Sequence, residues 1–137
     1  MEHNITPHKG VGELTFGMPV EQIVSLMGEP TEVESIYNAS DEPTTVLHYK
    51  EEGLTLFCEG ENPVLACIDI ANEDVTLFGE EIFDMTEKEI VRLMVANKYY
   101  EQDVDVEDWG ERRVAFGEAN IDFFFEAGEL MSVVIGR

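Results

Sequence analysis

The sequence predicts an α+β fold of two tandem helix-plus-four-strand units, with antiparallel sheets that carry helices on one face. Three observations lead to this class. The chain has 137 residues, enough for one compact domain. Hydrophobic residues make up 44% of it and include eight Phe, which argues against disorder. Two stretches of helical periodicity are each followed by strand-like stretches, the order expected when helices cover one face of antiparallel sheets.

An internal correspondence at a spacing of 67 residues divides the chain into two repeats. Residues 15–27 align with residues 82–94, with six identities in thirteen positions. The same spacing continues without a gap, and it pairs Phe57 with Phe124 and Ile68 with Ile135. We therefore expect residues 1–137 to form a single compact domain, with a first repeat over 11–72 and a second repeat over 75–137.

Each repeat is predicted to begin with a helix. In the first repeat, Pro19 suits a first helical position, and Gly28 followed by Pro30 ends the helix. In the second repeat, the residues from Thr86 to Glu89 match a capping box. Alternating apolar residues bounded by turn residues then predict strands. These are 32–38, 45–50, 53–59 and 64–70, a short linking strand at 75–78, and then 99–106, 112–117, 120–126 and 131–136.

The charge is strongly negative. Thirty acidic residues against eight basic ones give a net charge of −22 and a pI near 4.1. Phosphates repel such a surface, which excludes nucleic acid and anionic membranes as direct partners. A basic protein is the partner that the charge favours, through electrostatic steering. A generally acidic surface from a salt-adapted host is an alternative without a specific partner, and homo-oligomer formation is another.

The expected compartment is the cytoplasm. No apolar run approaches the ~20 residues that span a bilayer, and the first residues lack the pattern of a secretory signal. The two cysteines, Cys58 and Cys67, are too few for a disulfide scaffold, and we expect both to be reduced thiols. The sequon Asn38-Ala39-Ser40 is interpreted as chance for the same reasons.

The motifs that open and close the first repeat resemble a known family. The segment from Gly17-Met18-Pro19 to Leu26-Met27-Gly28-Glu29-Pro30, with Leu54–Phe57 and Leu65–Ile68, is similar to the outer-membrane assembly lipoproteins of the SmpA/OmlA type. A tandem pair of such units is similar to the β-lactamase inhibitory protein fold. The resemblance implies protein binding through a concave sheet surface. The chain lacks the cysteines of both families, and Asp84 stands where the first repeat has Gly17.

The residues favour a protein without catalytic chemistry. His3, His8 and His48 do not stand near a cysteine at zinc-site spacing, so the sequence predicts no metal site. Cys58 and Cys67 lie among acidic residues that raise a thiol pKa, which argues against a nucleophile. No phosphate loop or nucleophile elbow accompanies the carboxylates, and we expect no cofactor.

The segment from Asp103 to Glu107 has two interpretations. Asp103, Asp105 and Glu107 are spaced like the first ligands of a calcium loop, but Asp108 stands where an EF-hand needs glycine. Because these acids alternate with valines, we favour a half-buried edge strand with a solvated acidic face. The same acids are candidates for contact with a basic partner. Trp109, the only tryptophan, lies just beyond them and either contacts a partner or folds back on the core.

Phe57 and Phe124 occupy matching places in the two repeats, on the strand face that otherwise carries polar residues. With the hairpin register expected from the apolar pattern, Leu65 and Val134 join the same face. An apolar strip flanked by carboxylates, on the sheet side away from the helices, is typical of a protein-binding surface. The alternative is that the two rings pack where the repeats meet.

Together these features predict a non-enzymatic, acidic protein-binding module, such as an inhibitor or immunity protein for a basic partner. Two alternatives stand beside it: a small-ligand-binding protein or an enzyme, and an acidic surface without a specific cationic partner. The candidate partner-binding residues are Phe57, Phe124, Leu65, Val134, Trp109, Asp103, Asp105 and Glu107.

Overall fold

The computed structural model describes residues 3–37 and 42–137, so the sequon at 38–40 lies outside the described residues. Strands make up 47% of the structure and helices 16%. The fold is therefore predominantly β, with two sheets and two α-helices among the described residues. The expected α+β class with two helix-plus-four-strand units is wrong.

The strands that follow the two helices join in one antiparallel sheet of eight strands, in the order β10-β11-β12-β13-β7-β6-β5-β4. At its centre β13 pairs with β7, which places Ile135 opposite Ile68 and Val133 opposite Ile70. Separate four-stranded sheets would leave these two strands with unpaired backbone groups at their edges. Their pairing is why two units do not form. The strands are β4 (Glu32–Tyr37), β5 (Pro43–Tyr49), β6 (Leu54–Glu59), β7 (Val64–Ile70), β10 (Asp103–Val106), β11 (Glu111–Phe116), β12 (Ile121–Glu126) and β13 (Glu129–Gly136).

A second, five-stranded sheet with the order β3-β2-β1-β8-β9 was not expected. Its strands have two or three residues each, too few for a visible alternation of apolar and polar residues. β1 pairs in parallel with β8, so that Ile5 lies beside Leu77 and the N-terminal segment is tied to the middle of the chain. The strands are β1 (Asn4–Thr6), β2 (Gly10–Val11), β3 (Leu14–Thr15), β8 (Thr76–Leu77) and β9 (Glu80–Glu81).

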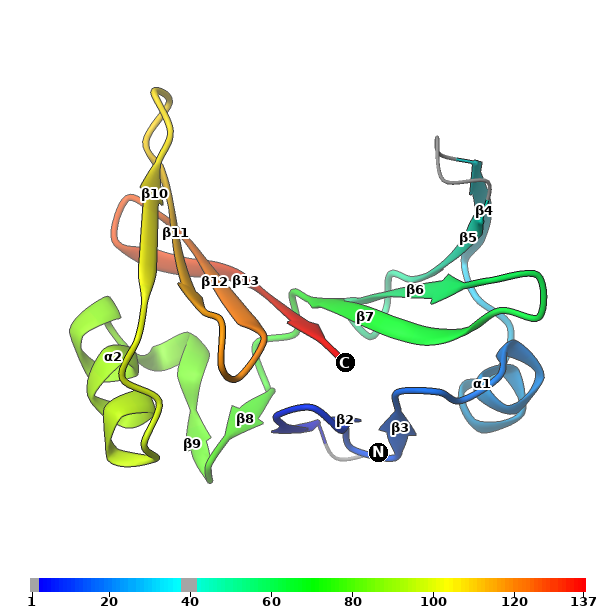
Figure 1. Cartoon of the computed structure of the whole chain (residues 1–137), viewed down its shortest axis with the longest axis horizontal. Helices are drawn as coiled ribbons and strands as arrows, with labels where there is room; N and C mark the ends of the chain where they lie inside the picture. Colours follow the sequence, from blue (N-terminus) through cyan, green and yellow to red (C-terminus); the bar gives the residue numbers. More distant parts are fainter. Residues whose placement is uncertain (1–2, 38–41) are drawn as a thin grey trace.

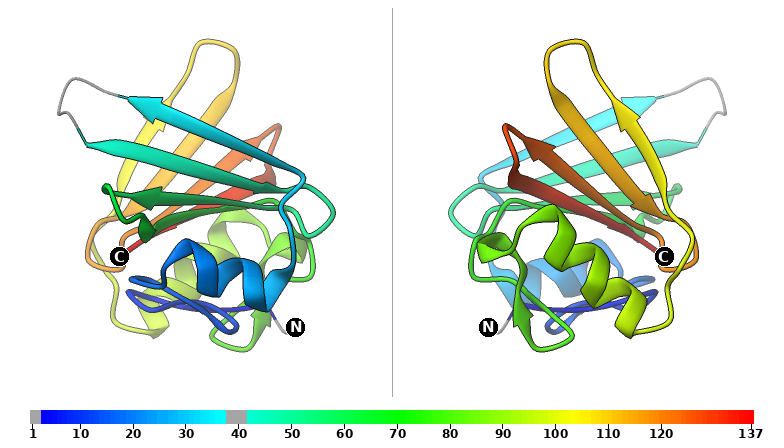
Figure 2. Two further views of the ribbon diagram at one scale, coloured as in Figure 1. Left: turned by 90° about the vertical axis from the view of Figure 1, so that its right-hand side faces the viewer. Right: turned by 90° about the vertical axis from the view of Figure 1, so that its left-hand side faces the viewer.

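Both helices lie on the same side of the eight-stranded sheet as the five-stranded sheet, as Figure 2 shows. They are α1 (Val20–Met27) and α2 (Glu87–Ala96), with a 3-10 turn η1 (Ile82–Asp84) before α2. The predicted capping box is confirmed: the Glu89 amide donates to Thr86 Oγ1 at 3.3 Å, and the Thr86 amide donates to Glu89 Oε1 at 3.0 Å. Over the described residues, no helix has the length and apolar character needed to cross a bilayer.

The hydrophobic core lies between these two layers and is one continuous cluster. It takes Ile23 from α1, Ile90 and Met94 from α2, and alternate residues from the central strands. Phe116 and Phe123 meet edge to face in it, with ring centroids 5.9 Å apart. One face of every central strand is therefore committed to the core, and the opposite face is left for other contacts.

Candidate functional site

The face of the eight-stranded sheet that points away from the core forms the candidate site. Both helices and the five-stranded sheet lie on the other side, and no described element covers this face (Figures 1 and 2). β4 and β5 rise at one end and β10 and β11 at the other, which makes the face concave with β7 and β13 in its floor (Figure 1). We call it the concave face. The strand registers place on it Glu34, Val46, Phe57, Cys67, Asp69, Val134, Asp122, Phe124, Arg113 and Asp105.

Phe57 and Phe124 both lie on the concave face, and each is half-buried. Phe57 stands opposite Val46, and Phe124 stands opposite Arg113. β7 and β13 separate the two strands that carry the rings, at about 4.8 Å for each strand-to-strand step. The two rings are also offset along the strand direction, because the registers place Phe57 toward one end of the β7–β13 pair and Phe124 toward the other end. The two rings therefore do not pack against each other.

Leu65 is not on the concave face. A β-bulge follows Phe57, so that Phe57 pairs with Cys67 while Cys58 pairs with Leu65. The extra residue, Ala66, turns Leu65 toward the core, where it is 0% exposed. Contact between Leu65 and a partner, which the sequence predicted, is therefore wrong. The prediction from strict alternation failed at Leu65 because it assumed a β6–β7 ladder without a bulge.

A hollow of about 670 Å³ lies in the floor of the concave face. Val134 lines it and is half-buried, as its alternation predicted. The other lining residues include the acidic Glu42, Glu59 and Asp122 and the C-terminal Arg137. The volume is in the range of sites that take a small molecule, and it also suits a long side chain of a docked protein.

Asp69 is the acidic residue of the otherwise apolar strand β7, and it stands opposite Val134. It is half-buried, and this burial raises the pKa of its carboxyl group. Within the described residues, no hydrogen bond or ion pair to this carboxylate is found. Asp69 was not among the residues predicted from the sequence, although a lone acid in a seven-residue apolar strand was a visible signal. An unpaired, half-buried carboxylate favours a cation beside it.

Replacing Asp69 with asparagine should stabilise the protein at neutral pH. Because the folded-state pKa is raised, the folded protein binds this proton more tightly than the unfolded chain does. The free energy of unfolding of the wild type therefore falls as the pH rises through this pKa, and the variant lacks that loss. We expect a higher urea midpoint for Asp69→Asn at pH 7 and a smaller difference near pH 4. An equal difference at both values would contradict the assignment.

Arg113 organises the end of the concave face formed by β10, β11 and β12. It pairs with Asp105 on β10, and its Nε donates to Asp122 Oδ2 on β12 at 3.2 Å. The bond to Asp122 is the main cause that raises the pKa of Arg113. Asp103 and Asp105 lie on β10, the edge strand, and Glu107 follows it; all three are exposed. The edge position and the solvated acidic face are confirmed, but the predicted half-burial is wrong, because Val104 and Val106 are exposed as well.

Trp109 lies in the turn between β10 and β11, at the tip of the hairpin that rises beside the concave face (Figure 1). Its side chain is 69% exposed, and its indole Nε1 donates to Glu111 Oε2 at 3.2 Å. The alternative in which Trp109 folds back on the core is therefore wrong, and its contact with a partner stays a prediction. An exposed tryptophan at a hairpin tip is available to a docked partner.

The two thiols lie on opposite faces of the sheet. Cys58 is buried in the core, and Cys67 is half-buried on the concave face. Burial raises the pKa of each thiol to about 11, and nearby Asp69 and Asp122 add to the effect at Cys67. Both are therefore protonated at neutral pH, whereas a nucleophilic cysteine requires a lowered pKa.

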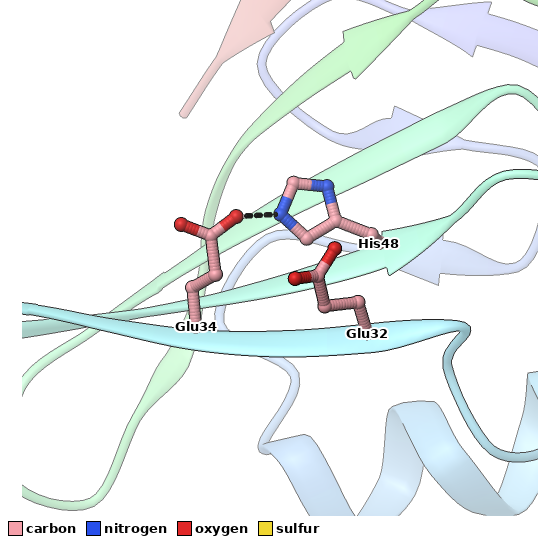
Figure 3. A group of neighbouring side chains, drawn as sticks. All are labelled: Glu32, Glu34 and His48. Atoms are coloured by element: carbon pink, nitrogen blue, oxygen red, sulfur yellow. Dashed lines mark hydrogen bonds and ion pairs between the residues drawn. The ribbon is translucent and has the colours of Figure 1, made fainter.

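Glu32, Glu34 and His48 gather where β4 begins and β5 ends (Figure 3). His48 Nε2 lies 2.5 Å from Glu34 Oε1, and Lys50 Nζ lies 3.7 Å from Glu32 Oε2. This cluster was not predicted from the sequence, because the histidines were compared with cysteines alone. An alternating Glu-x-Glu strand and a histidine on the next strand were the available signal, but only the register joins them.

The fold belongs to an architecture seen in bacterial proteins of known structure. The uncharacterized protein YfeY from Escherichia coli matches over 100% of both chains, with a TM-score of 0.62 and 12% sequence identity. An extracellular protein containing an SCP domain, from Bacillus anthracis, matches 95% of this chain and 49% of that chain, with a TM-score of 0.53 and 16% identity. Identities this low establish the fold alone.

Comparison of the sequence with models of known families and with curated proteins gives no match. The resemblance to SmpA/OmlA-type lipoproteins and to the β-lactamase inhibitory protein stays a prediction, since neither matched structure bears on it.

Proposed function

We propose that the chain is a non-enzymatic protein-binding module whose concave face docks a basic partner protein. The observation that carries the proposal is the placement of Phe57 and Phe124, two half-buried rings on a sheet face that no described element covers. Aromatic residues are enriched in the cores of protein interfaces, with polar residues around them. The carboxylates of Glu34, Asp69 and Asp122 surround the two rings in this way.

The charge supports a basic partner. A net charge of −22 steers a cationic protein toward the face and raises its association rate by roughly tenfold to a thousandfold at low salt. Asp69 gives the floor an unpaired carboxylate that a lysine or arginine of the partner would neutralise. An inhibitor or immunity protein that covers a cationic active site would use a surface of this kind.

A second candidate is the binding of a small cationic ligand, which the hollow of about 670 Å³ favours. Only the docking of a protein requires the two aromatic rings, because Val134 lines the hollow whereas Phe57 and Phe124 lie outside its lining.

We also place the protein in the cytoplasm, because two thiols on opposite sheet faces cannot pair and free thiols suit a reducing compartment.

Loss of partner capture by the double variant Phe57→Ala/Phe124→Ala tests the proposal. Proteins captured from native lysate are identified, and the affinity of the purified pair is measured at low and high salt. We expect about thirtyfold weaker binding by the double variant, corresponding to the loss of about 2 kcal/mol at a hot spot. Higher salt should slow association with both forms.

Phe78→Ala is the matched control, since Phe78 follows β8 in the five-stranded sheet and lies on the other side of the molecule. It removes the same ring and should leave capture unchanged. Equal recovery of one basic partner by the wild type and the double variant would contradict docking on the concave face. A ligand lost only when Val134 is changed would favour the hollow instead.

A further inference from the structure

Glu32, Glu34 and His48 bring three metal-binding atoms together at one end of the concave face. One carboxylate oxygen from each glutamate and an imidazole nitrogen lie within 4.8 Å of one another. The side chains converge in the space beside β4 and β5 (Figure 3). The cluster lies on the concave face beside Phe57, and Glu34 is also one of the carboxylates that surround the rings, but binding of a metal ion goes beyond the docking proposed above.

The backbone register fixes this arrangement. Glu32 stands directly opposite His48 across the β4–β5 pair, and Glu34 is one same-face position further along β4. Same-face neighbours on paired strands have Cβ atoms about 5 Å apart when directly opposite and about 7–8 Å apart on the diagonal. The three side chains therefore meet because of hydrogen-bonded strands and not because of a loop.

The other end of the sheet shows how its carboxylates are neutralised. There Arg113 sits between Asp105 and Asp122 and pairs with both. At the β4–β5 end, the cation that approaches is Lys50, which reaches Glu32 at 3.7 Å with a side chain that is 66% exposed. In the described structure, Glu34 has an imidazole as its partner and no lysine or arginine within ion-pair distance.

We propose that Glu32, Glu34 and His48 form a binding site for a divalent metal ion of the Zn²⁺ class. A neutral imidazole and two carboxylates are ligands that Zn²⁺ accepts, whereas Ca²⁺ and Mg²⁺ prefer oxygen alone. Bonds of about 2.0 Å in a tetrahedral site place ligand atoms about 3.3 Å apart. Side-chain rotation brings the three atoms to that spacing and moves Glu34 away from its present contact with His48. Three protein ligands leave the fourth position to water.

Titration of the purified full-length chain with ZnCl₂, after treatment with a chelator, tests the site by calorimetry. We expect one Zn²⁺ per chain, and binding at least about tenfold weaker in His48→Ala and in Glu34→Gln. Glu34→Gln keeps the size of the side chain, so it remains informative if His48→Ala perturbs the strand pair. Calcium chloride, used as a second probe, should bind at least about tenfold more weakly than zinc.

His8→Ala and Glu80→Gln are the matched controls. The His8 imidazole bonds the Glu118 carbonyl far from the cluster, and Glu80 is exposed on β9 of the five-stranded sheet. Both variants should bind zinc like the wild type. Equal zinc affinity of the wild type, His48→Ala and Glu34→Gln would overturn the site, and so would equal weakening by Glu80→Gln, which would show general attraction of cations to an acidic chain. No partner protein is present, so this result and the docking result are independent.

Discussion

Replacing Phe123 with alanine should lower the free energy of unfolding by about 3–5 kcal/mol. Phe123 is 0% exposed and lies on β12, where it faces the core and meets Phe116 edge to face. Removing the ring deletes this contact and leaves a cavity that rigid neighbouring strands cannot fill. Urea unfolding followed by far-UV circular dichroism measures the loss.

Phe124→Ala is the matched comparison, because it removes the same side chain from the next position of the same strand. Phe124 is half-buried on the concave face, so truncation opens no internal cavity. We expect a loss of about 1 kcal/mol, less than the value for a fully buried side chain. Equal losses for the two variants would mean that the two rings do not point to opposite faces of β12.

This comparison also determines how the docking experiment is interpreted. A Phe124→Ala protein that keeps most of its stability remains folded at room temperature. Lost capture of a partner by Phe124→Ala, measured beside the double variant, then reports a missing contact on the concave face and not an unfolded module.

The positions of the long strands were predictable from residue types alone. Leu54, Leu56 and Cys58 alternate with polar or half-exposed residues in β6, and all three are buried. The same alternation in β12 assigns Phe123 to the core and Phe124 to the other face. Alternation predicts the sides of the central strands well, because each of these strands has one face on a single core, whereas the edge strands β4 and β10 bury neither face.

The partners of the strands were not predictable in the same way. Pairing of β7 with β13 gives one sheet. This pairing depends on backbone N–H and C=O groups at the strand edges, and no side-chain pattern in the sequence reveals it. The turn after β6 is also longer than the turn after β12, so the spacing of 67 fails beyond the turn. Ile68 faces Leu56, whereas Phe123 faces Val133 and not Ile135. A spacing read from the sequence cannot detect such a shift when apolar residues recur on every strand.

The candidate sites also divide into those visible within one strand and those that depend on how the strands pair. Phe57 and Phe124 were found from the sequence because a large ring interrupts a polar face within one strand. Asp69 and the cluster around His48 were missed, because their environment comes from neighbouring strands. Burial of one carboxylate and convergence of three side chains are properties of the register, which the sequence does not display.

Replacing Ile135 with alanine should destabilise the whole molecule by about 2–5 kcal/mol, in a single transition. Ile135 is buried on β13 and stands opposite Ile68 at the junction of the two strand sets. Because this pair lies inside one continuous core, a cavity there weakens both sides of the sheet together. Far-UV circular dichroism follows all strands, and fluorescence of Trp109 follows the β10–β11 hairpin. The two urea curves should coincide.

Ile68→Ala and the double variant Ile68→Ala/Ile135→Ala complete a double-mutant cycle across the junction of β7 and β13. Side chains in direct contact couple by about 0.5–3 kcal/mol, so the double variant should differ from the sum of the single ones by that amount. Two independent units would behave differently: Ile135→Ala would weaken the transition seen by Trp109 and leave a second, unchanged transition in the circular dichroism. Additive losses with two separate transitions would contradict a single eight-stranded sheet, and with it the continuous concave face on which docking depends.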